Sequence, residues 1–592
     1  MYISELKLWN FRKYGKQDYN LDNPHLVVPF NDGLNVLIGE NDSGKTAILD
    51  AIKLVLKTHA YEWIKIEDVD FYDDSTKLRI EIIFKGLKIE EAKNFTEWLG
   101  WEGEGDEAKP ILRLIYEVEI KNDRILPSDI KAGMDETGYP LNAEAKDYLR
   151  ATYLKALRDA DNELIAKKNS RVSQILQGHD LFKKNEGQPP HEFVGWLTGV
   201  NDKIKSWFEK TEVIGDSKSN KEQIKDIIDK FLKEFIKDSY SSKLQLTDPE
   251  IKAILEKISL GIEGAKNLGL GTMNRLYMAT ELLHLKKEWD GLKLCLIEEL
   301  EAHLHPQAQM KVVEALQKEK GVQFILTTHS PNLASKVNIE NLIICNENEV
   351  YPLRKGDTKL ANENYAFLKR FLDVTKSNLF FAKGVIIVEG WAEEILIPAI
   401  AERLGYDLTK NEVSIVNVGS TAYLHFAKIF LRNDGKAMDV AIAVVTDLDI
   451  RPNDSGVFSE PDQQRKRAKI KNSLGDLLNS KVEIFIAKEW TLEWCLFKSE
   501  SLSELFKQAT SVVHSRTKSF KKVVNNWSAN FQTALICKLK KGKGASPLDK
   551  VAVANSLAEK ISDNNPTLEE SDEYLKYVID AIKHACRVNN DN

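Results

Sequence analysis

The chain of 592 residues is too long for a single hydrophobic core, so roughly two to four domains are expected. Hydrophobic residues make up 43% of the chain and charged residues 29%, which is ordinary for a soluble globular protein, and no long apolar run predicts a membrane span. The net charge of −7 does not by itself indicate a nucleic-acid-binding protein, and five widely spaced cysteines without a CxxC pair argue against a disulfide framework or zinc ribbon and for a reducing cytoplasm.

The first residues, MYISELKLWNFRKYG, lack a basic segment followed by an apolar one, so they predict a strand and no signal peptide. Further strand-like segments follow within residues 1–142. Residues 143–258 are mostly helical in pattern, and alternating strands and helices return in residues 259–370. This order predicts an α/β domain split in sequence by a helical insertion, which would form a dimerisation arm or a plain lid.

Residues 39–46 fit the pattern GxxxxGK[ST], follow an apolar segment and precede a helical one. In such a loop, glycines let backbone N–H groups turn toward a phosphate, a lysine reaches the phosphate oxygens and a hydroxyl binds Mg²⁺. An ordinary glycine-rich turn is the alternative, which the flanking strand and helix disfavour. The candidate ATP-binding residues of the loop are Gly39, Asn41, Ser43, Gly44, Lys45 and Thr46, with Thr46 as the Mg²⁺ ligand.

Two later apolar segments are each followed directly by polar residues. Residues 292–297 are followed by Glu298 and Glu299, and residues 324–328 are followed by His329. We expect Glu298 to hold Mg²⁺ through water, Glu299 to orient or deprotonate the attacking water, and His329 to sense the γ-phosphate. A single histidine with apolar flanks is more often structural, but here the order and spacing agree with the other motifs.

The segments EExEAHLHP and LTTHSP together resemble the ABC-type ATPases of the OLD (overcoming lysogenization defect) nuclease and RecF/SMC-like group. The strand Leu6–Arg12 resembles theirs too, where the basic residues lie near the nucleotide. The resemblance implies a head-to-tail dimer in which each signature loop completes the partner's ATP site, and residues 268–274 match that loop best. Glu298 stands where Asp is usual and Leu300 where Pro is usual, which removes no carboxylate.

A new α/β unit is predicted in residues 371–592. Glu389 follows its first apolar strand, and Glu393 is expected on the first turn of the helix that comes next. Asp447 and Asp449 form a DxD after another strand. This edge of an open α/β sheet is where sites are built. In an extended segment, residues i and i+2 point the same way, so the two aspartates should converge. Clustered carboxylates suit hard divalent cations, and two such ions could activate water and stabilise the leaving oxygen of a phosphodiester.

An EGxxE motif and a later DxD, each closing an apolar strand, resemble the Toprim domain. Toprim domains also occur in topoisomerases and primases, but no tyrosine-bearing cleavage domain or zinc module is visible, and the ATPase motifs select the OLD class. The same resemblance makes Glu493 a metal ligand and Lys550, or alternatively Lys543, the lysine that stabilises the phosphate charge. The catalytic candidates are Glu389, Asp447, Asp449, Lys550 and Glu299, and the candidate metal ligands are Glu389, Glu393, Asp447, Asp449, Glu493 and Thr46.

The remainder, from about Thr491, is predicted to be mostly helical and basic. Between Lys507 and Lys543 there are nine Lys or Arg and no Asp or Glu. Such a stretch could neutralise DNA phosphates, and a solvated basic surface is the equally weighted alternative.

The predicted fold class is therefore α/β, with an ABC-type P-loop ATPase domain split by a helical insertion, then a Toprim domain and a mostly helical C-terminal part. The predicted function is an ATP-regulated DNA endonuclease with two Mg²⁺ or Mn²⁺ ions, acting as a homodimer or tetramer without membrane association. The resemblance implies antiviral defence, with a helicase or a reverse transcriptase and non-coding RNA as partner. The alternatives are an SMC/RecF-like ATP-switched DNA-binding repair protein without nuclease activity, and an RNA-cleaving toxin. The direction of the ATP effect and the cleavage specificity are not predicted.

Overall fold

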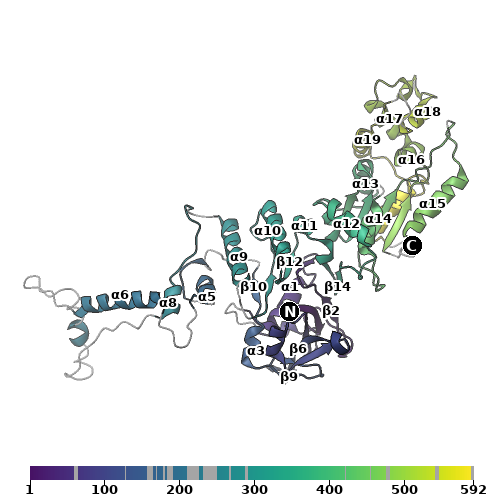
Figure 1. The fold of residues 1–592 in the computed structure, drawn as a ribbon. Helices are drawn as coiled ribbons and strands as arrows, with labels where there is room; N and C mark the ends of the chain where they lie inside the picture. Colours follow the sequence, from purple (N-terminus) through teal and green to yellow (C-terminus); the bar gives the residue numbers. More distant parts are fainter. Residues whose placement is uncertain are drawn as a thin grey trace, which may run out of the picture. The chain divides into compact units, whose positions relative to one another are not determined.

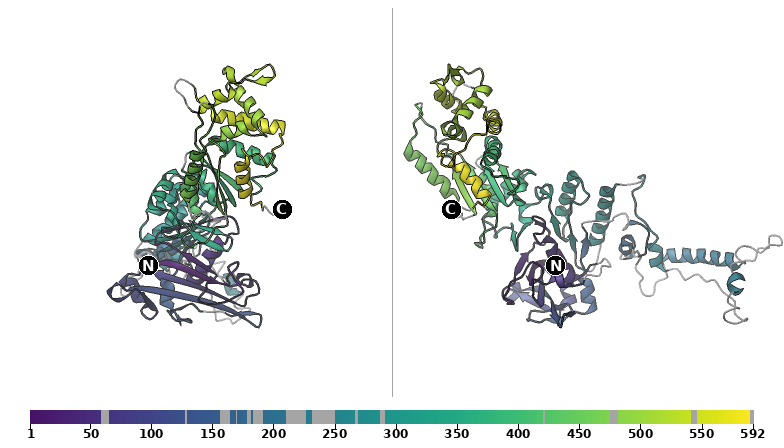
Figure 2. Two further views of the ribbon diagram at one scale, coloured as in Figure 1. Left: turned by 90° about the vertical axis from the view of Figure 1, so that its right-hand side faces the viewer. Right: turned by 180° about the vertical axis from the view of Figure 1, so that it is seen from behind.

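In the computed structural model the chain divides into two compact units. The first comprises Met1–Ala156 and Gly291–Asn592, and the second Leu157–Asp290. Figures 1 and 2 show the elements of each unit. The structure describes residues 1–58, 65–126, 129–155, 164–168, 170–177, 181–182, 191–209, 226–230, 250–265, 269–286, 291–419, 422–453, 455–474, 481–540 and 546–588.

The central sheet of the ATPase part has the strand order β10-β11-β12-β3-β13-β14. Strand β3 (Leu34–Ile38) is buried at every position and lies parallel to β12 (Gln323–Thr328) and β13 (Leu342–Asn346). Its run of apolar residues suits a strand that is covered on both faces. Helix α1 (Lys45–Leu56) follows β3, so the phosphate loop lies at the carboxyl end of a central strand. The other strands of this sheet are β10 (Thr152–Leu154), β11 (Leu294–Ile297) and β14 (Glu349–Pro352).

A second, antiparallel sheet has the order β2-β1-β4-β6-β8-β9, and β5 and β7 also pair with β6. Buried residues of this sheet and of α1 form one hydrophobic cluster with residues of β11 and β12, so both sheets share a core. Its strands are β1 (Tyr2–Trp9), β2 (Leu26–Pro29), β4 (Lys77–Lys85), β5 (Leu99–Glu102), β6 (Lys109–Lys121), β7 (Arg124–Leu126), β8 (Lys131–Ala132) and β9 (Tyr139–Pro140). Short helices α2 (Ile89–Ala92) and α3 (Ala143–Tyr148) belong to the same region.

The inserted unit is helical in its described part. Helix α5 packs against α8 and α9. A buried ion pair joins α5 to α9, because Arg171 Nε lies 2.5 Å and Arg171 Nη2 2.7 Å from the two carboxylate oxygens of Glu281. The described helices are α5 (Arg171–Gln177), α6 (Glu192–Glu209), α8 (Ile251–Leu255) and α9 (Leu270–Lys286).

The predicted insertion, residues 143–258, and the compact unit Leu157–Asp290 differ at both ends. Strand β10 pairs in parallel with β11, which keeps the segment after residue 143 in the ATPase unit. Helix α9 lies in the inserted unit, where Glu281 binds Arg171. A three-residue strand has too short a pattern to be predicted from periodicity. The role of the insertion as a dimerisation arm stays a prediction.

The Toprim part contains a parallel sheet with the order β16-β15-β17-β18. The two middle strands, β15 (Gly384–Val388) and β17 (Ala441–Thr446), are buried at every position. Helices α13, α19 and α20 share one hydrophobic cluster with these strands, and α19 packs against α13. The edge strands are β16 (Val413–Asn417) and β18 (Val482–Ile486), and the helices are α13 (Trp391–Arg403), α14 (Tyr423–Ala427), α15 (Glu460–Leu474), α16 (Leu492–Lys498), α17 (Ser503–Val513), α18 (Phe531–Leu539), α19 (Lys550–Asn564) and α20 (Lys576–Ala585).

Helices α10 (Pro306–Lys318) and α11 (Pro331–Ala334) connect strands of the central ATPase sheet, and α12 (Asn362–Phe371) lies between the two α/β regions in sequence. A small hairpin, β19 (Lys522–Val523) with β20 (Asn526–Trp527), lies within the basic stretch. Together these elements confirm the predicted α/β fold class, with an ATPase region interrupted by helices and a second sheet after it. Among the described residues, no helix has both the length and the apolar character to cross a membrane.

Candidate functional site

The phosphate loop between β3 and α1 has a left-handed backbone at three positions, with φ of 147° at Gly39, 59° at Asp42 and 93° at Gly44. A Cβ at Gly39 would lie 2.3 Å from the carbonyl oxygen of Cys345. A Cβ at Gly44 would lie 2.0 Å from the hydroxyl of Tyr14. Both glycines are therefore required by the space around them as well as by the backbone.

Lys45 is buried, and its ammonium lies inside the loop. It donates hydrogen bonds of 2.9 Å to the carbonyl of Gly39 and to Ser43 Oγ. Burial lowers the pKa of Lys45, and the carboxylate of Glu301 opposes that shift. The loop thus holds a partly desolvated cation where the phosphates of ATP would meet it. Two further predicted ATP-binding residues of the loop, Asn41 and Thr46, are exposed.

The two acidic residues after β11 occupy different positions. Glu298 accepts a 2.5 Å hydrogen bond from the hydroxyl of Tyr153, a residue of β10. The backbone N–H of Glu299 donates to Thr327 Oγ1 at 3.0 Å, and Glu299 has a left-handed φ of 43°. The turn is therefore fixed by β10 and β12, with Glu298 directed toward β10, whereas the charge of Glu299 acts on Lys45 of the phosphate loop.

His329 and Glu301 form a second link at this edge. The backbone N–H of His329 donates to Glu301 Oε1 at 2.6 Å, and Glu301 Oε2 is buried without a hydrogen-bond partner in the described structure. Burial and the positive charge of Lys45 lower the pKa of His329, so its ring is neutral at neutral pH. The sequence motif gave no indication that Glu301 lies close to both Lys45 and His329. This proximity follows from the fold.

The basic residues after β1 contact the same loop and helix. Lys13 Nζ donates to the carbonyl of Asp42 at 2.9 Å. Arg12 lies 2.7 Å from Asp50 of α1 and 2.8 Å from Asp70. This placement agrees with the expectation that basic residues of the first strand lie near the nucleotide.

The predicted signature segment lies in the inserted unit, at the start of α9. Residues 266–268 lie outside the described part of the chain, while Asn274 of the same segment is fully buried. Its predicted contribution to a partner's ATP site stays a prediction.

Four segments bring carboxylates to the carboxyl edge of the Toprim sheet. Glu389 directly follows β15 and Asp447 directly follows β17. Glu393 lies in the first turn of α13 and Glu493 in the first turn of α16, and both are buried. Acidic groups are favoured in a first helical turn because the backbone N–H groups there carry partial positive charge.

Hydrogen bonds fix the two strand-end carboxylates. Thr446, the last residue of β17, donates its hydroxyl to Glu389 Oε1. The backbone N–H of Leu492 donates to Asp447 Oδ1 at 2.9 Å. Glu389 is thus tied to the neighbouring strand and Asp447 to the start of α16.

Lys550 reaches the same cluster from the first residue of α19. Its Nζ lies 2.9 Å from Glu493 Oε2. Desolvation opposes the charged ammonium, but the carboxylates of Glu493 and Asp447 together raise the pKa of Lys550. The alternative candidate, Lys543, lies outside the described residues.

Crowded negative charge dominates the cluster electrostatically. Burial and the neighbouring Glu493 raise the pKa of Glu393 to about 7. The pKa of Asp447 is raised well above its usual value by burial, Glu493 and Glu393. Burial and the charge of Asp449 also raise the pKa of Glu389, although its hydrogen bond from Thr446 opposes the shift. A bound cation would therefore stabilise the ionised form of these crowded carboxylates.

The DxD does not have the expected geometry. Strand β17 ends at Thr446, and Asp449 has a left-handed φ of 57° with its N–H donating to the carbonyl of Trp490 at 2.8 Å. The charge of Asp449 raises the pKa of Glu389. The pKa of Asp447 is raised mainly by burial and by the carboxylates of α16 and α13. The charge of Glu389 contributes to the raised pKa of both Asp447 and Glu393, so these carboxylates form one interacting cluster.

These groups fit divalent cations by their chemistry. Glu493 is buried, and within the described part of the chain neither of its oxygens accepts a hydrogen bond, while Lys550 Nζ lies 2.9 Å from its Oε2. As the side chains stand, no three His, Cys, Asp or Glu of the described residues converge closely enough to hold a metal ion. The cluster therefore supplies hard oxygen ligands of the kind that divalent cations prefer, in an arrangement that does not by itself close around an ion.

Two residues near the cluster carry no motif that would identify them. Tyr577 of α20 has a buried hydroxyl without a hydrogen-bond partner in the described structure. Burial raises the pKa of Tyr577, as do the charges of Asp447, Glu393 and Glu493. Lys466 of α15 opposes the rise in the pKa of Glu389. Only packing brings these side chains to the cluster, because they lie far from the acidic motifs in sequence.

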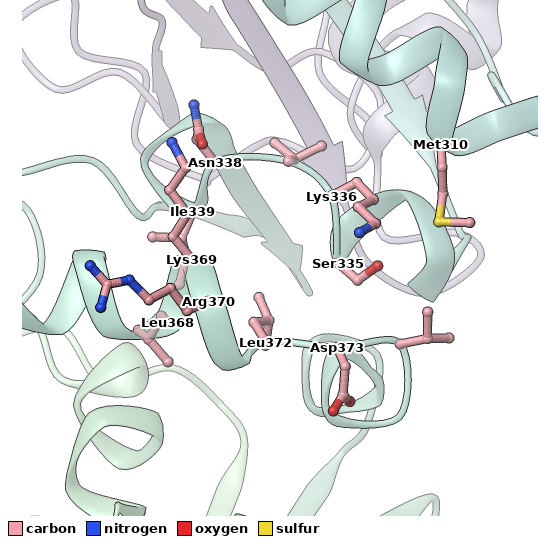
Figure 3. Close-up of a pocket in the computed structure, with 12 residues that line it drawn as sticks. Met310, Ser335, Lys336, Asn338, Ile339, Leu368, Lys369, Arg370, Leu372 and Asp373 are labelled. Atoms are coloured by element: carbon pink, nitrogen blue, oxygen red, sulfur yellow. The ribbon is translucent and has the colours of Figure 1, made fainter. Parts of the chain in front are cut away.

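A pocket of about 380 Å³ lies elsewhere in the same unit. Met310, residues 335–339, and residues 368–370 and 372–374 line it (Figure 3). None of the predicted site residues lines this pocket, so its position does not alter the assignment of the two sites.

Two family matches cover the two regions. Residues 34–335 match the family described as AAA domain, putative AbiEii toxin, Type IV TA system. Residues 380–449, which include Glu389, Glu393, Asp447 and Asp449, match the TOPRIM domain of overcoming lysogenization defect protein-like sequences.

Two curated relatives align with most of the chain. The endonuclease GajA of Bacillus cereus (strain VD045) is 25% identical over 446 residues, covering 72% of this chain and 72% of that protein. The OLD nuclease of Thermus scotoductus (strain ATCC 700910 / SA-01) is 22% identical over 478 residues, covering 74% of this chain and 83% of that protein. The solved C-terminal region of the Xanthomonas campestris pv. campestris OLD protein is 19% identical, with a TM-score of 0.25, and the match covers 36% of this chain and 95% of that one. Because the AAA-domain match spans half of the chain, the chain belongs to this AAA-domain family; an OLD-like Toprim match follows it, and the chain is homologous to the GajA and OLD nucleases.

Proposed function

We propose that this nuclease cleaves DNA in a reaction that requires Mg²⁺ or Mn²⁺ and is regulated by ATP, as an effector of antiviral defence. The carboxylate cluster with Lys550 at the carboxyl edge of the Toprim sheet supports this function most directly. The named relatives, an endonuclease and an OLD nuclease, support the same reaction class.

The carboxylates divide naturally between two cation positions. Glu389 and Asp449 would hold one ion, and Asp447, Glu393 and Glu493 would hold the other, with Glu389 near both. When bound, the ions would supply Lewis acidity toward a water molecule and the phosphodiester. Thr46 and Glu298 are the proposed residues for a separate Mg²⁺ that accompanies ATP.

The chain's own groups have distinct tasks in this scheme. Glu389, held by Thr446 and raised in pKa, is suited to accept a proton from the attacking water. Lys550 carries a positive charge beside Glu493 and would donate to a phosphate oxygen as negative charge develops in the transition state. Asp447 is fixed by the N–H of Leu492 and keeps its orientation without substrate.

The ATPase region would act as the regulatory element. Lys45 and Thr46 would bind the phosphates and Mg²⁺, Glu299 would orient water, and His329 would contact the γ-phosphate. We propose that ATP is bound between two copies of the chain and that a helicase or a reverse transcriptase with non-coding RNA acts as the defence partner.

A nuclease assay on supercoiled plasmid tests the reaction. With Mg²⁺ or Mn²⁺ the protein should produce nicked or linear DNA, and with EDTA it should produce none. Glu389→Gln and Asp447→Asn should abolish cleavage and leave circular dichroism unchanged. Glu394→Gln is the matched control, because Glu394 binds Asn417 at 2.8 Å and is not a proposed ligand. Normal cutting by the Glu389 and Asp447 variants would show that the Toprim cluster is not the nuclease site.

Two additions to the assay separate the alternatives. Parallel reactions with and without ATP give the direction of regulation. Reactions with RNA in place of plasmid detect an RNA-cleaving toxin, and binding of DNA without any cleavage identifies an ATP-switched DNA-binding protein.

A further inference from the structure

Helix α15 has a strongly basic composition beyond its first turn. Its acidic residues, Glu460 and Asp462, lie in that first turn, where the helix dipole favours them. Five basic residues follow with no acid between them, Arg465, Lys466, Arg467, Lys469 and Lys471. In Figure 2 the helix lies beside the four-stranded Toprim sheet.

The outer side of α15 is open to solvent. Lys469 and Lys471 are exposed, and neither forms an ion pair within the described part of the chain. Arg465 is 80% exposed, and the nearest carboxylate oxygen, on Asp462, is 3.6 Å from its guanidinium. An ion pair as exposed as this one contributes little, so the guanidinium is available to another anion.

The inner side of α15 is fixed to the acidic cluster. Ile470 packs against Leu448, the residue between the two aspartates of the DxD, and against Ile486 of β18. Arg467 Nη2 donates to the carbonyl of Ala487 at 2.9 Å and also to the carbonyl of Lys488. The helix is thus held in place by the loop that carries Asp447 and by the end of strand β18.

The basic stretch from Lys507 to Lys543 is less available than its sequence suggests. Lys522 lies 2.8 Å from Glu504, and Lys538 donates to the carbonyl of Ser546 at 3.0 Å. Part of that stretch therefore serves the structure of the C-terminal helices. In α15, by contrast, three basic side chains are exposed, those of Arg465, Lys469 and Lys471.

We infer that α15 binds the phosphate backbone of duplex DNA and holds it beside the Toprim carboxylates. This inference rests on the proposed nuclease function and adds the surface that positions its substrate. A helix of this length spans about 22 Å, comparable with roughly six base pairs along a duplex, so several phosphates can lie within reach of its cations. Contacts of this kind fix register without reading sequence.

The salt dependence of DNA binding tests this role. A labelled duplex is titrated with the full-length protein by fluorescence anisotropy, with Ca²⁺ in place of Mg²⁺, across a series of salt concentrations. Replacing both exposed lysines, Lys469→Ala with Lys471→Ala, should reduce the slope of log affinity against log salt by about two, since each phosphate contact contributes about 0.9. Affinity near physiological salt should fall about tenfold.

A second double variant provides the control. Lys359→Ala with Lys410→Ala removes two exposed lysines that lie outside α15 and form no ion pair in the described structure. Its slope should equal that of the parent, as should its plasmid cleavage. Melting temperatures of both double variants should match, because exposed lysines without partners contribute little to folding.

The possible outcomes distinguish a failure of the α15 inference from a failure of the proposed nuclease function. A shallower slope in the α15 variant alone supports the inference. If the parent binds and cuts DNA but the α15 slope is unchanged, or if both double variants lower it equally, α15 is not the binding surface and the nuclease function stands. If the parent neither binds nor cuts DNA, the proposed function and this inference both fall.

Discussion

The phosphate loop takes its polar groups from consecutive residues, Gly39–Thr46, whereas the acidic cluster takes them from distant strands and helices. In the loop, Lys45 already donates to oxygens of its own backbone and of Ser43. In the cluster, Glu393 and Asp447 repel each other and their neighbours, and the pKa of each is raised. The phosphate loop is built within one local turn, while the acidic cluster depends on packing and on added positive charge. Substitutions in the phosphate loop should therefore alter ATP binding, whereas substitutions in the acidic cluster should alter DNA cleavage.

Removing Lys550 should have the largest effect, because it takes away the cation that lies against Glu493 in the cluster. Lys550→Ala is expected to lower the rate constant for cleavage at saturating DNA and Mg²⁺ by about 100- to 1,000-fold, the cost of losing a transition-state donor. Lys550→Arg should recover part of the loss because it keeps the charge. Single-turnover cleavage of a labelled duplex measures both.

Lys560→Ala is the control for this change, since Lys560 lies toward the other end of the same helix. Circular dichroism in Mg²⁺ checks that α19 remains folded. Near-normal cleavage by Lys550→Ala would remove Lys550 from the chemistry and favour Lys543.

Removing Lys45 should affect only the other site. Lys45→Ala is expected to weaken ATP binding by about 10- to 100-fold, because charge-assisted hydrogen bonds contribute about 1.5–3 kcal/mol each. Binding of a fluorescent ATP analogue measures this loss, with Lys57→Ala at the far end of α1 as the control. Cleavage without nucleotide should persist, and its loss would contradict the separation of the two sites.

Tyr577 distinguishes positioning from folding within the cluster. Its hydroxyl is a buried donor without a partner among the described residues, close to the negative charges of Asp447 and Glu493. If the hydroxyl donates to a cluster carboxylate once the ions are bound, Tyr577→Phe should raise the Mg²⁺ concentration for half-maximal cleavage about tenfold. A titration of Mg²⁺ at saturating DNA measures the change.

Tyr574→Phe is the matched control, because the neighbours that raise its pKa do not include Asp447, Glu393 or Glu493. If Tyr577→Phe lowers the melting temperature but leaves the Mg²⁺ requirement unchanged, the hydroxyl has only a structural role.

The contrast between the sites also explains what the sequence could predict. The phosphate loop is a local pattern, and an apolar strand that ends in an acid places a carboxylate at the sheet edge, as Glu389 and Asp447 show. Both depend on neighbouring residues only. The α/β fold class follows from the same alternation of strands and helices.

Features that depend on distant packing could not be predicted in this way. The left-handed φ of Asp449 changes the direction of the DxD, and nothing in the three residues signals it. Tyr577 reaches the cluster because α20 packs on the Toprim sheet, and Glu301 lies near His329 because two strands are adjacent. Strand β10 is too short for a recognisable period and is defined by its partner, β11.

The smallest expected effect concerns a contact that links the two sites. Lys383 precedes β15, the strand that ends at Glu389, and its Nζ lies 2.9 Å from Glu412 and 3.8 Å from Glu40 of the phosphate loop. Exposed ion pairs are weak, so Lys383→Ala should change the ratio of cleavage with and without ATP by at most about fivefold. Cleavage without ATP should be unaffected. Plasmid assays at saturating and zero ATP give this ratio.

Lys436→Ala is the matched control, since Lys436 is similarly exposed and forms a 2.8 Å ion pair with Glu349 away from the loop. A nucleotide that reorders the phosphate loop must also move or release Glu40, and Lys383 is the side chain that would carry this change to β15. If the ATP response of Lys383→Ala equals that of the control, Glu40 and Lys383 do not transmit the nucleotide signal. Any effect of ATP on cleavage would then have to be transmitted from the phosphate loop to the acidic cluster through the backbone of the unit rather than through the Lys383–Glu40 contact.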